Sequence, residues 1–324
     1  MAPVLDVADL VSRAREGQPR AVARLISMVE DAAPAMREVT AALAPYSGRA
    51  HVVGLTGAPG VGKSTSTSAL VAAYRAQGLR VGVLAVDPSS PFSGGALLGD
   101  RVRMQEHATD PGVYIRSMAS RGHLGGLAWA TPQAVRVLDA AGYDVVLVET
   151  VGVGQSEVEV AGAADTTVVL LAPGMGDGVQ AAKAGILEIG DVFVVNKADR
   201  DGADSTAREL RHMITLGSGP RSGSADDRWT PPVLKTVAAT ATGVDEVVAA
   251  IAVHREWLER SGELVVRRRA RASVEVEAIA FDALRARMGD LRGDARLDAL
   301  AARVVDGSID PYAAADTLVE GLTT

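Results

Sequence analysis

A glycine-rich segment from Gly57 to Ser64, with the sequence GAPGVGKS, constrains this chain more than any other feature. It follows the apolar run 51–56, and a helix-compatible stretch continues to Gln77. A buried strand before the loop and a helix after it are the context that a phosphate-binding loop requires. Glycines let backbone N–H groups turn inward around an anion, because no Cβ blocks the approach. The segment therefore predicts an α/β fold with a nucleoside triphosphate site.

The loop and the start of its helix supply the predicted phosphate contacts. Lys63 adds a full positive charge and the helix N-terminus a partial one, while the Ser64 hydroxyl can ligate Mg²⁺. The predicted phosphate-binding residues are Gly57, Ala58, Pro59, Gly60, Val61, Gly62, Lys63, Ser64 and Thr65.

The composition excludes several classes of protein. Apolar residues make up 48% of the 324 residues, which is enough for a large core. The net charge of −7 argues against general nucleic-acid binding. The absence of cysteine excludes disulfides and thiolate metal sites. Because no membrane-spanning stretch or signal pattern is visible, we expect a soluble, cytoplasmic protein without a membrane partner.

Short apolar runs alternate with mostly helix-length segments in the middle of the chain, which predicts a largely parallel sheet with helices on both faces. The predicted strands cover residues 51–56, 81–86, 113–116, 143–148, 166–171, 192–195 and 233–237. The expected fold is an α/β P-loop NTPase, with an N-terminal helical segment and a C-terminal helical arm. The expected division is a helical extension 1–46, a P-loop domain 47–255 and a helical segment 256–324.

Two apolar stripes at helical spacing follow the predicted domain, and a stripe outside a complete core must bury against something. A second subunit is one candidate, and packing on the same chain is the other. The basic run Arg267–Arg271 is expected to be a solvated or ion-paired helix face. The stripes consist of Val274, Ala278, Phe281, Leu284 and Met288, and of Leu297, Leu300 and Val304.

The segment Asn196-Lys197-Ala198-Asp199 follows the apolar run 192–195 and predicts specificity for guanine. The Asp199 carboxylate can accept hydrogen bonds from guanine N1–H and N2–H₂, whereas adenine offers no such pair of donors. The Lys197 stem can lie over the ring, and Asn196 can bridge base and loop. GTP is therefore favoured over ATP as the nucleotide, with GDP as its product.

Acidic residues at strand ends predict the metal site. Asp87 and Glu149 each close a predicted strand, so both should lie at the carboxyl edge of the sheet, near the phosphates. Mg²⁺ takes oxygen ligands and keeps several waters, which suits these carboxylates and Ser64. Asp87 could instead be a helix N-cap.

The segment after Glu149 bears on hydrolysis. The N–H of Gly152 could sense the γ-phosphate, but Val153 stands where many small GTPases have a water-orienting glutamine, and Gln155 lies two residues further on. This predicts slow intrinsic hydrolysis that a partner or another loop accelerates. Candidate charge stabilisers are Arg103, Arg121 and Lys183.

Two glycine-rich stretches, 119–126 and 173–178, are candidate switch segments because glycine lowers the cost of a backbone change. His123 in the first stretch could act as a base, although a structural or partner-contacting role is favoured.

Taken together, the motifs resemble those of the methylmalonyl-CoA mutase-associated GTPases, the MeaB-type proteins formerly described as arginine/ornithine transport kinases. The resemblance covers nearly the whole chain. It rests on the segments Thr56–Thr65, Val86–Pro91, Gly99–Met104, Arg121–Gly126, Glu149–Glu157 and Asn196–Asp199.

This resemblance implies a homodimeric P-loop GTPase of the SIMIBI class, in which residues 47–255 are the GTPase domain and residues 256–324 the dimerisation segment. It also implies a G-protein chaperone that gates adenosylcobalamin loading of methylmalonyl-CoA mutase and protects that enzyme. By similarity Asp87, Asp100 and Glu149 would surround Mg²⁺, and Lys183 would belong to a loop that moves when the mutase binds. No direct binding of cobalamin is expected. The second guanine loop departs from the Ser-Ala pair common in relatives, and its predicted residues are Val237, Ala238 and Ala239.

Three other classes remain as alternatives. A nickel or zinc metallochaperone GTPase would share the nucleotide motifs, but the chain lacks the usual cysteine motifs. A kinase acting on a transport protein needs a positioned acceptor and base, and the guanine motif is unusual for one. A non-catalytic dimerisation module would not need complete phosphate, metal and base motifs.

Overall fold

The computed structural model describes residues 6–31, 35–87, 104–119, 130–150, 160, 162–174, 186–217, 228–288 and 295–320. The chain forms two compact units, Met1–Val265 and Val266–Thr324. Each unit is described by itself below. The division into three parts expected from the sequence stays a prediction.

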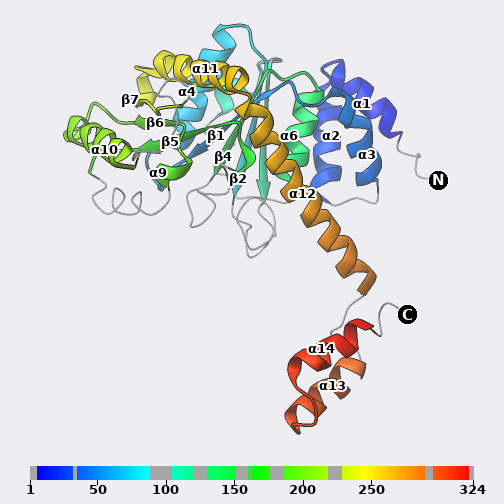
Figure 1. Ribbon diagram of the computed structural model, residues 1–324. Coiled ribbons are helices and arrows are strands. Elements are labelled where there is room, and N and C mark those ends of the chain that lie inside the picture. The colour runs from blue at the N-terminus through cyan, green and yellow to red at the C-terminus, as the bar shows by residue number, and fades with distance from the viewer. Residues whose placement is uncertain are drawn as a thin grey trace. The chain divides into compact units, whose positions relative to one another are not determined.

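The first unit is built on a seven-stranded sheet in the order β3-β2-β4-β1-β5-β6-β7, in which every strand pair is parallel (Figure 1). The α/β P-loop architecture expected from the sequence is confirmed. The strands are β1 (His51–Thr56), β2 (Val81–Asp87), β3 (Val113–Ala119), β4 (Val145–Thr150), β5 (Thr166–Leu171), β6 (Val192–Val195) and β7 (Val233–Lys235).

Four strands differ in their boundaries from the sequence expectation: β2 ends one residue later, at Asp87, β4 covers 145–150 instead of 143–148, and the ends of β3 and β7 also shift. β3 continues to Ala119 because it stays paired with β2 along its whole length. β4 starts only at Val145, since the Tyr143 N–H still bonds to the Leu138 carbonyl at the end of the preceding helix. β7 stops at Lys235 because the chain then turns into an antiparallel bridge from Val237 to Thr242.

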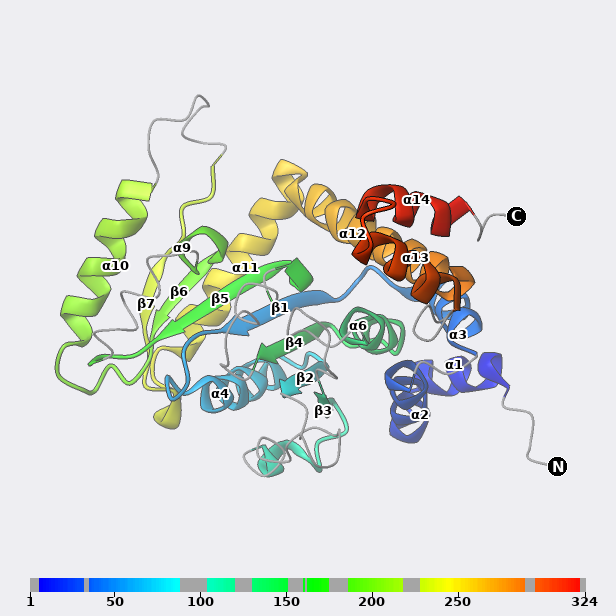
Figure 2. The same cartoon turned by 90° about the horizontal axis from the view of Figure 1, so that it is seen from below.

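Helices cover both faces of the sheet (Figures 1 and 2). Helices α4 (Lys63–Ala76) and α11 (Val244–Ser261) pack on one face, where they share a core with β1, β2, β4, β5 and β6. Helix α6 (Thr131–Ala140) packs on the other face together with the N-terminal helices. All residues of β1, β4 and β5 are buried, as expected for strands covered on both sides.

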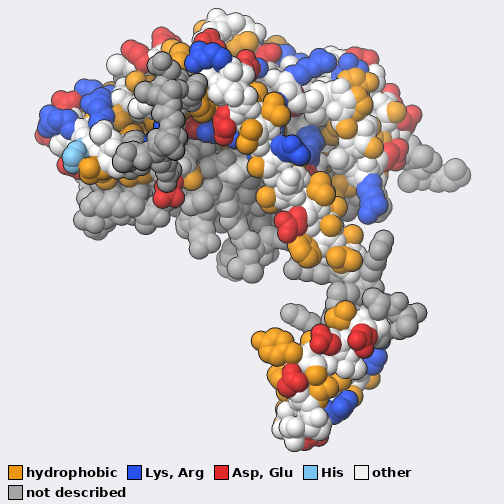
Figure 3. Space-filling model, viewed as in Figure 1, with side chains coloured by type: hydrophobic (Ala, Val, Ile, Leu, Met, Phe, Trp, Pro, Cys, Tyr) orange, Lys and Arg blue, Asp and Glu red, His pale blue; other side chains and the backbone are white. Residues whose placement is uncertain are grey.

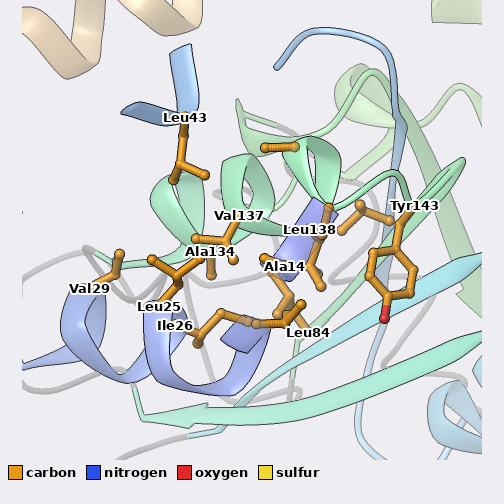
Figure 4. Packing of buried hydrophobic residues seen from close by; sticks show 14 of the residues in the cluster. Ala14, Leu25, Ile26, Val29, Leu43, Leu84, Ala134, Val137, Leu138 and Tyr143 are labelled. Carbon is orange, nitrogen blue, oxygen red and sulfur yellow. The ribbon is translucent and has the colours of Figure 1, made fainter. Parts of the chain in front are cut away.

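The N-terminal helices α1 (Val7–Arg15), α2 (Pro19–Glu30) and α3 (Met36–Leu43) pack against α6, with the 3₁₀ turn η1 (Ala44–Tyr46) after them. Figure 4 shows Leu25, Ile26 and Val29 of α2 near Ala134 and Val137 of α6. The linker that follows is held by one buried carboxylate: Asp139 of α6 accepts hydrogen bonds from the backbone N–H groups of residues 48–50.

The β5–β7 side of the sheet has its own small core, centred on the fully buried Phe193. Helix α10 (Ala203–Gly217) contributes Ala207 and Leu210 to it, and α9 (Ile186–Ile189) adds the partly buried Leu187. The remaining short elements are the 3₁₀ turns η2 (Gln105–His107) and η4 (Ala238–Thr240).

The second unit is helical. Helix α12 (Glu263–Met288) starts in the first unit and continues into the second, where α13 (Ala295–Val305) and α14 (Pro311–Glu320) follow. Leu300, Ala314 and Leu318 form a small core between α13 and α14. Among the helices of the described residues, we find none with the length and apolar character to span a bilayer.

Candidate nucleotide-binding site

The phosphate-loop segment lies at the carboxyl end of β1 and leads directly into α4, which begins at Lys63. Two of its glycines are sterically required. Gly57 has φ +142°, and a Cβ there would lie 2.2 Å from the Leu170 carbonyl oxygen. Gly62 has φ +96°, and a Cβ would lie 2.5 Å from Asn196 Nδ2. The loop path is therefore closed to residues with side chains at these positions.

The amine of Lys63 lies inside the loop. Lys63 Nζ donates to the carbonyl oxygens of Gly57 at 2.6 Å and Ala58 at 3.1 Å, and the residue is 8% exposed. A buried ammonium held by neutral carbonyls keeps its charge close to where the loop N–H groups would bind an anion.

A buried carboxylate stands beside the first turn of α4. Glu149 is 1% exposed, and its two oxygens accept hydrogen bonds from Ser64 Oγ at 2.7 Å and from Thr67 Oγ1 at 2.8 Å. The structure thus brings together two of the residues expected at the metal, Ser64 and Glu149. It places Glu149 inside β4 rather than just beyond it.

Sequence reasoning missed Thr67. Its hydroxyl also lies 3.0 Å from the Lys63 carbonyl oxygen, which fixes it between the helix and Glu149. The spacing of three residues from Ser64 puts both hydroxyls on one face of α4, and that is the signal that could have indicated it.

Asn196 connects the two parts of the expected nucleotide site. Its Nδ2 donates to the Val61 carbonyl at 2.9 Å, while its Oδ1 accepts from Thr236 Oγ1 at 3.1 Å and from the Ala238 N–H at 3.0 Å. The side chain is buried, so every one of these bonds is shielded from water. The side-chain amide of Asn196 therefore joins the end of β6 to the phosphate loop and to the segment predicted as the second guanine loop.

The neighbouring residues complete this arrangement. Lys197 has the unusual φ of +56°, and its Nζ donates to the Gly60 carbonyl at 2.6 Å, so its stem runs from the β6 end to the phosphate loop. Asp199 is exposed and can accept donors from a ligand. Val237 is held in a bridge with Thr242, and η4 carries Ala238 and Ala239.

Several expected residues cannot be placed. Only the backbone of Asp87 is described, at the end of β2 beside Ala119. Most of the two candidate switch stretches, with His123, also lies outside the described residues. The same is true of Asp100, Arg103, Arg121, Gly152, Gln155 and Lys183.

The oxygen atoms of Ser64 and Glu149 suit a hard divalent cation such as Mg²⁺, and they lie next to the phosphate-loop lysine. No group of three or more His, Asp or Glu side chains with metal-ligating geometry occurs among the described residues. A cation here would thus depend on few protein ligands, as Mg²⁺ sites at phosphates commonly do.

Comparison with known proteins gives a family match over most of the chain. Residues 22–291 match the family described as methylmalonyl Co-A mutase-associated GTPase MeaB. A Pyrococcus abyssi protein that is likewise named a GTPase is 48% identical over 96% of this chain and 95% of its own length. The mouse methylmalonic aciduria type A homolog, a mitochondrial protein, is 40% identical over 68% of this chain and 53% of its own length.

Among solved structures, the chain is similar to a LAO/AO transport system kinase. The TM-score is 0.71 at 28% identity, and the match covers 99% of this chain and all of the other.

Proposed function

Because the chain belongs to the MeaB family of methylmalonyl-CoA mutase-associated GTPases, we propose that it is a GTP-hydrolysing switch for a mutase of this kind. In this proposal it gates the loading of adenosylcobalamin into methylmalonyl-CoA mutase and protects the loaded enzyme. The family name and the name of the mouse relative support the choice of partner. The observation that carries the switch is the Asn196 side chain, which couples the base-binding segments to the phosphate loop.

In the proposed complex the residues from Gly57 to Thr65 hold the phosphates, with Lys63 turning from the loop carbonyls toward the β- and γ-phosphates. Asp199 accepts the two guanine donors, and Lys197 covers the ring. Backbone N–H groups of Val237, Ala238 and Ala239 are the proposed partners of guanine O6. This assignment accounts for GTP as substrate and GDP as product.

We place Mg²⁺ between Ser64, Glu149, Asp87 and Asp100. A Mg²⁺ ion held there would supply positive charge to offset the charge that develops on the phosphates during transfer. The contribution of the chain is to hold the Glu149 carboxylate in a fixed orientation, through the Ser64 and Thr67 hydroxyls.

Hydrolysis by the isolated chain should be slow, because Val153 offers no group to orient water. The proposed source of acceleration is the partner, acting through candidates such as Arg103, Arg121, Gly152, Gln155 and Lys183. In this proposal the time until GTP is hydrolysed sets how long the GTP-bound complex with the partner persists.

We further propose that the working form is a homodimer joined through α12. Hydrophobic side chains lie exposed along this helix (Figure 3). Phe281 is 54% exposed and Val274 is 68% exposed, which is costly in water unless another surface covers them.

The test uses the methylmalonyl-CoA mutase of the same organism. We expect calorimetry to show binding whose affinity differs between GDP and a non-hydrolysable GTP analogue, and we expect the mutase to accelerate phosphate release. A clean mutase that neither binds nor stimulates would show that the partner is a different protein.

A kinase function is the alternative to consider, because the similar solved structure is named a transport system kinase. Incubation with γ-labelled GTP and candidate protein acceptors separates the two. A stable labelled acceptor would contradict the proposal, whereas free phosphate alone supports it.

A further inference from the structure

A cavity of about 420 Å³ opens at the amino edge of the sheet, opposite the edge that carries the phosphate loop. It lies where β2 and β4 begin and is bordered by the end of α6 and by α11. All of its lining residues belong to the first unit. Its volume falls within the range of about 300–1,000 Å³ typical of small-ligand sites, and the nucleotide site does not use it.

Three arginines from separate elements line this cavity: Arg15 at the end of α1, Arg49 in the linker and Arg255 in α11. Arg15 stacks on the Tyr46 ring, with the guanidinium carbon 3.7 Å from the ring centroid. Within the described part of the chain, neither the Arg15 nor the Arg49 guanidinium forms a hydrogen bond or ion pair. Arg255 uses only Nε, in a bond of 2.9 Å to Glu259. The guanidinium groups of these arginines therefore still offer N–H donors to a ligand in the cavity.

The two aspartates of the lining are already engaged by backbone donors. Asp139 accepts the N–H groups of residues 48–50, and Asp144 Oδ2 accepts the Arg80 N–H at 2.7 Å. Their charge is thus stabilised without help from the cavity arginines. Arg80 does not line the cavity: its guanidinium lies 4.5 Å from the ring centroid of Tyr143 and donates to the carbonyl oxygens of Ala141 and Gly142.

The rest of the lining is apolar or aromatic. Leu79 and Val145 contribute aliphatic surface, and Tyr46 and Tyr143 contribute rings. Tyr143 is 4% exposed and belongs to the core shared by α6 and the N-terminal helices (Figure 4), so this wall is rigid. A wall of this kind is suited to the organic body of a ligand rather than to a bare ion.

We propose that this cavity binds a small phosphorylated organic molecule. Guanidinium groups that come from three different elements favour a tetrahedral anion, because phosphate offers oxygens in more directions than a planar carboxylate does. The aromatic and aliphatic wall takes the organic portion. The site is separate from the GTP site and does not depend on the proposed mutase partner.

The test is a fluorescence titration of the full chain with 1-naphthyl phosphate, after the GTP site has been saturated with GDP and Mg²⁺. We expect saturable binding that weakens by about tenfold or more in the variant R15Q/R49Q, which loses two charge-assisted contacts. The matched control is R20Q/R24Q, which removes two exposed arginines of α2 that do not line the cavity. Its affinity should equal that of the parent, and GDP affinity should be unchanged in all three proteins.

Three competitors make the result decisive. 1-Naphthol should bind far more weakly than its phosphate, and inorganic phosphate should compete poorly. Equal binding of either one would overturn the proposal, as would unchanged affinity in a folded R15Q/R49Q variant or the absence of saturable binding. Tighter competition by a decaglutamate peptide would also overturn it, in favour of a surface for an acidic protein segment.

Discussion

At the residue scale, the proposed nucleotide site makes Asp199 the side chain that sets the choice of base. Asp199→Asn replaces one acceptor of the guanine donors with a donor, so GTP should bind at least about tenfold more weakly, since one partner is left unpaired. Xanthosine triphosphate carries an oxygen where guanine carries its amino group, and it should gain affinity in the same variant. Competition against a fluorescent GDP measures both effects; equal losses for the two nucleotides would contradict the role given to Asp199.

Thr67 is the second residue with a separable effect. Thr67→Val keeps the shape of the side chain but removes the hydrogen bond to Glu149. The lost hydrogen bond contributes about 1–2 kcal/mol to holding the carboxylate in its present orientation. We expect the Mg²⁺ concentration for half-maximal GTP hydrolysis to rise several-fold, while metal-free GDP binding stays unchanged. Ser66→Ala on the same helix is the control, because Ser66 Oγ is buried without a hydrogen-bond partner in the described structure. Equal effects in both variants would show that the helix, not Glu149, is affected.

At the scale of elements, α11 is fastened to the amino edge of the sheet by buried polar groups. His254 is fully buried, with Nε2 3.3 Å from Asp191 Oδ1 and Nδ1 2.8 Å from Thr166 Oγ1. Asp191 Oδ2 also accepts the Thr167 N–H at 2.8 Å. Asp191→Ala should therefore lower the free energy of unfolding by about 1–3 kcal/mol, because the buried Thr167 N–H loses its acceptor.

Urea denaturation measures this loss. The control is Asp204→Ala, which removes the exposed partner of Lys235 and should change stability little. If both substitutions have the same small effect, the buried pair does not hold α11 in place.

Helix α4 is tied to the segment before β3 by an ion pair that depends on pH. The hydrogen bond from Arg75 lowers the pKa of Asp110 below its ordinary value of 3.8. A depressed folded-state pKa contributes stability above that ordinary value, and the contribution disappears as pH falls through the folded-state pKa. We expect Asp110→Asn to be less stable than the parent at neutral pH, and the two stability curves to converge in acid. A constant difference at all pH values would contradict this.

The elements themselves were largely predictable, and the contacts between them were not. Continuous apolar runs such as Val145–Val148 predicted buried parallel strands correctly, because period and composition are local properties. The ends of β3 and β7 were missed because pairing partners, not propensity, set them. Thr67 beside Glu149 and His254 beside Asp191 join segments far apart in the chain. The spacing from Ser64 indicates the helix face on which Thr67 lies, but it does not identify Glu149 as the partner, and no spacing pairs His254 with Asp191. The arginine-lined cavity was not predicted for the same reason, since its lining residues come from segments far apart in the chain.

At the scale of the whole molecule, the exposed residues of α12 lead to a prediction about assembly. Val274→Glu combined with Phe281→Glu places charges on the exposed apolar surface and should convert a dimer to a monomer in analytical ultracentrifugation. Val305→Glu on α13 is the control, because Val305 is 88% exposed and lies outside that surface. If the double variant and the control sediment alike, α12 is not the dimer contact.

The strand order has a consequence for how the chain is made. β1 and β2 are separated in the sheet by β4, which is synthesised more than fifty residues after β2. A nascent chain that has left the ribosome only as far as β3 therefore carries β1 with neither of its final neighbours, since β5 comes later still. Such unpaired apolar strands are prone to association with other chains. The helices α1 to α3 emerge before β1, but α6, against which they pack, is made only later. We therefore expect this GTPase to depend on protection from association during translation until β5 is complete.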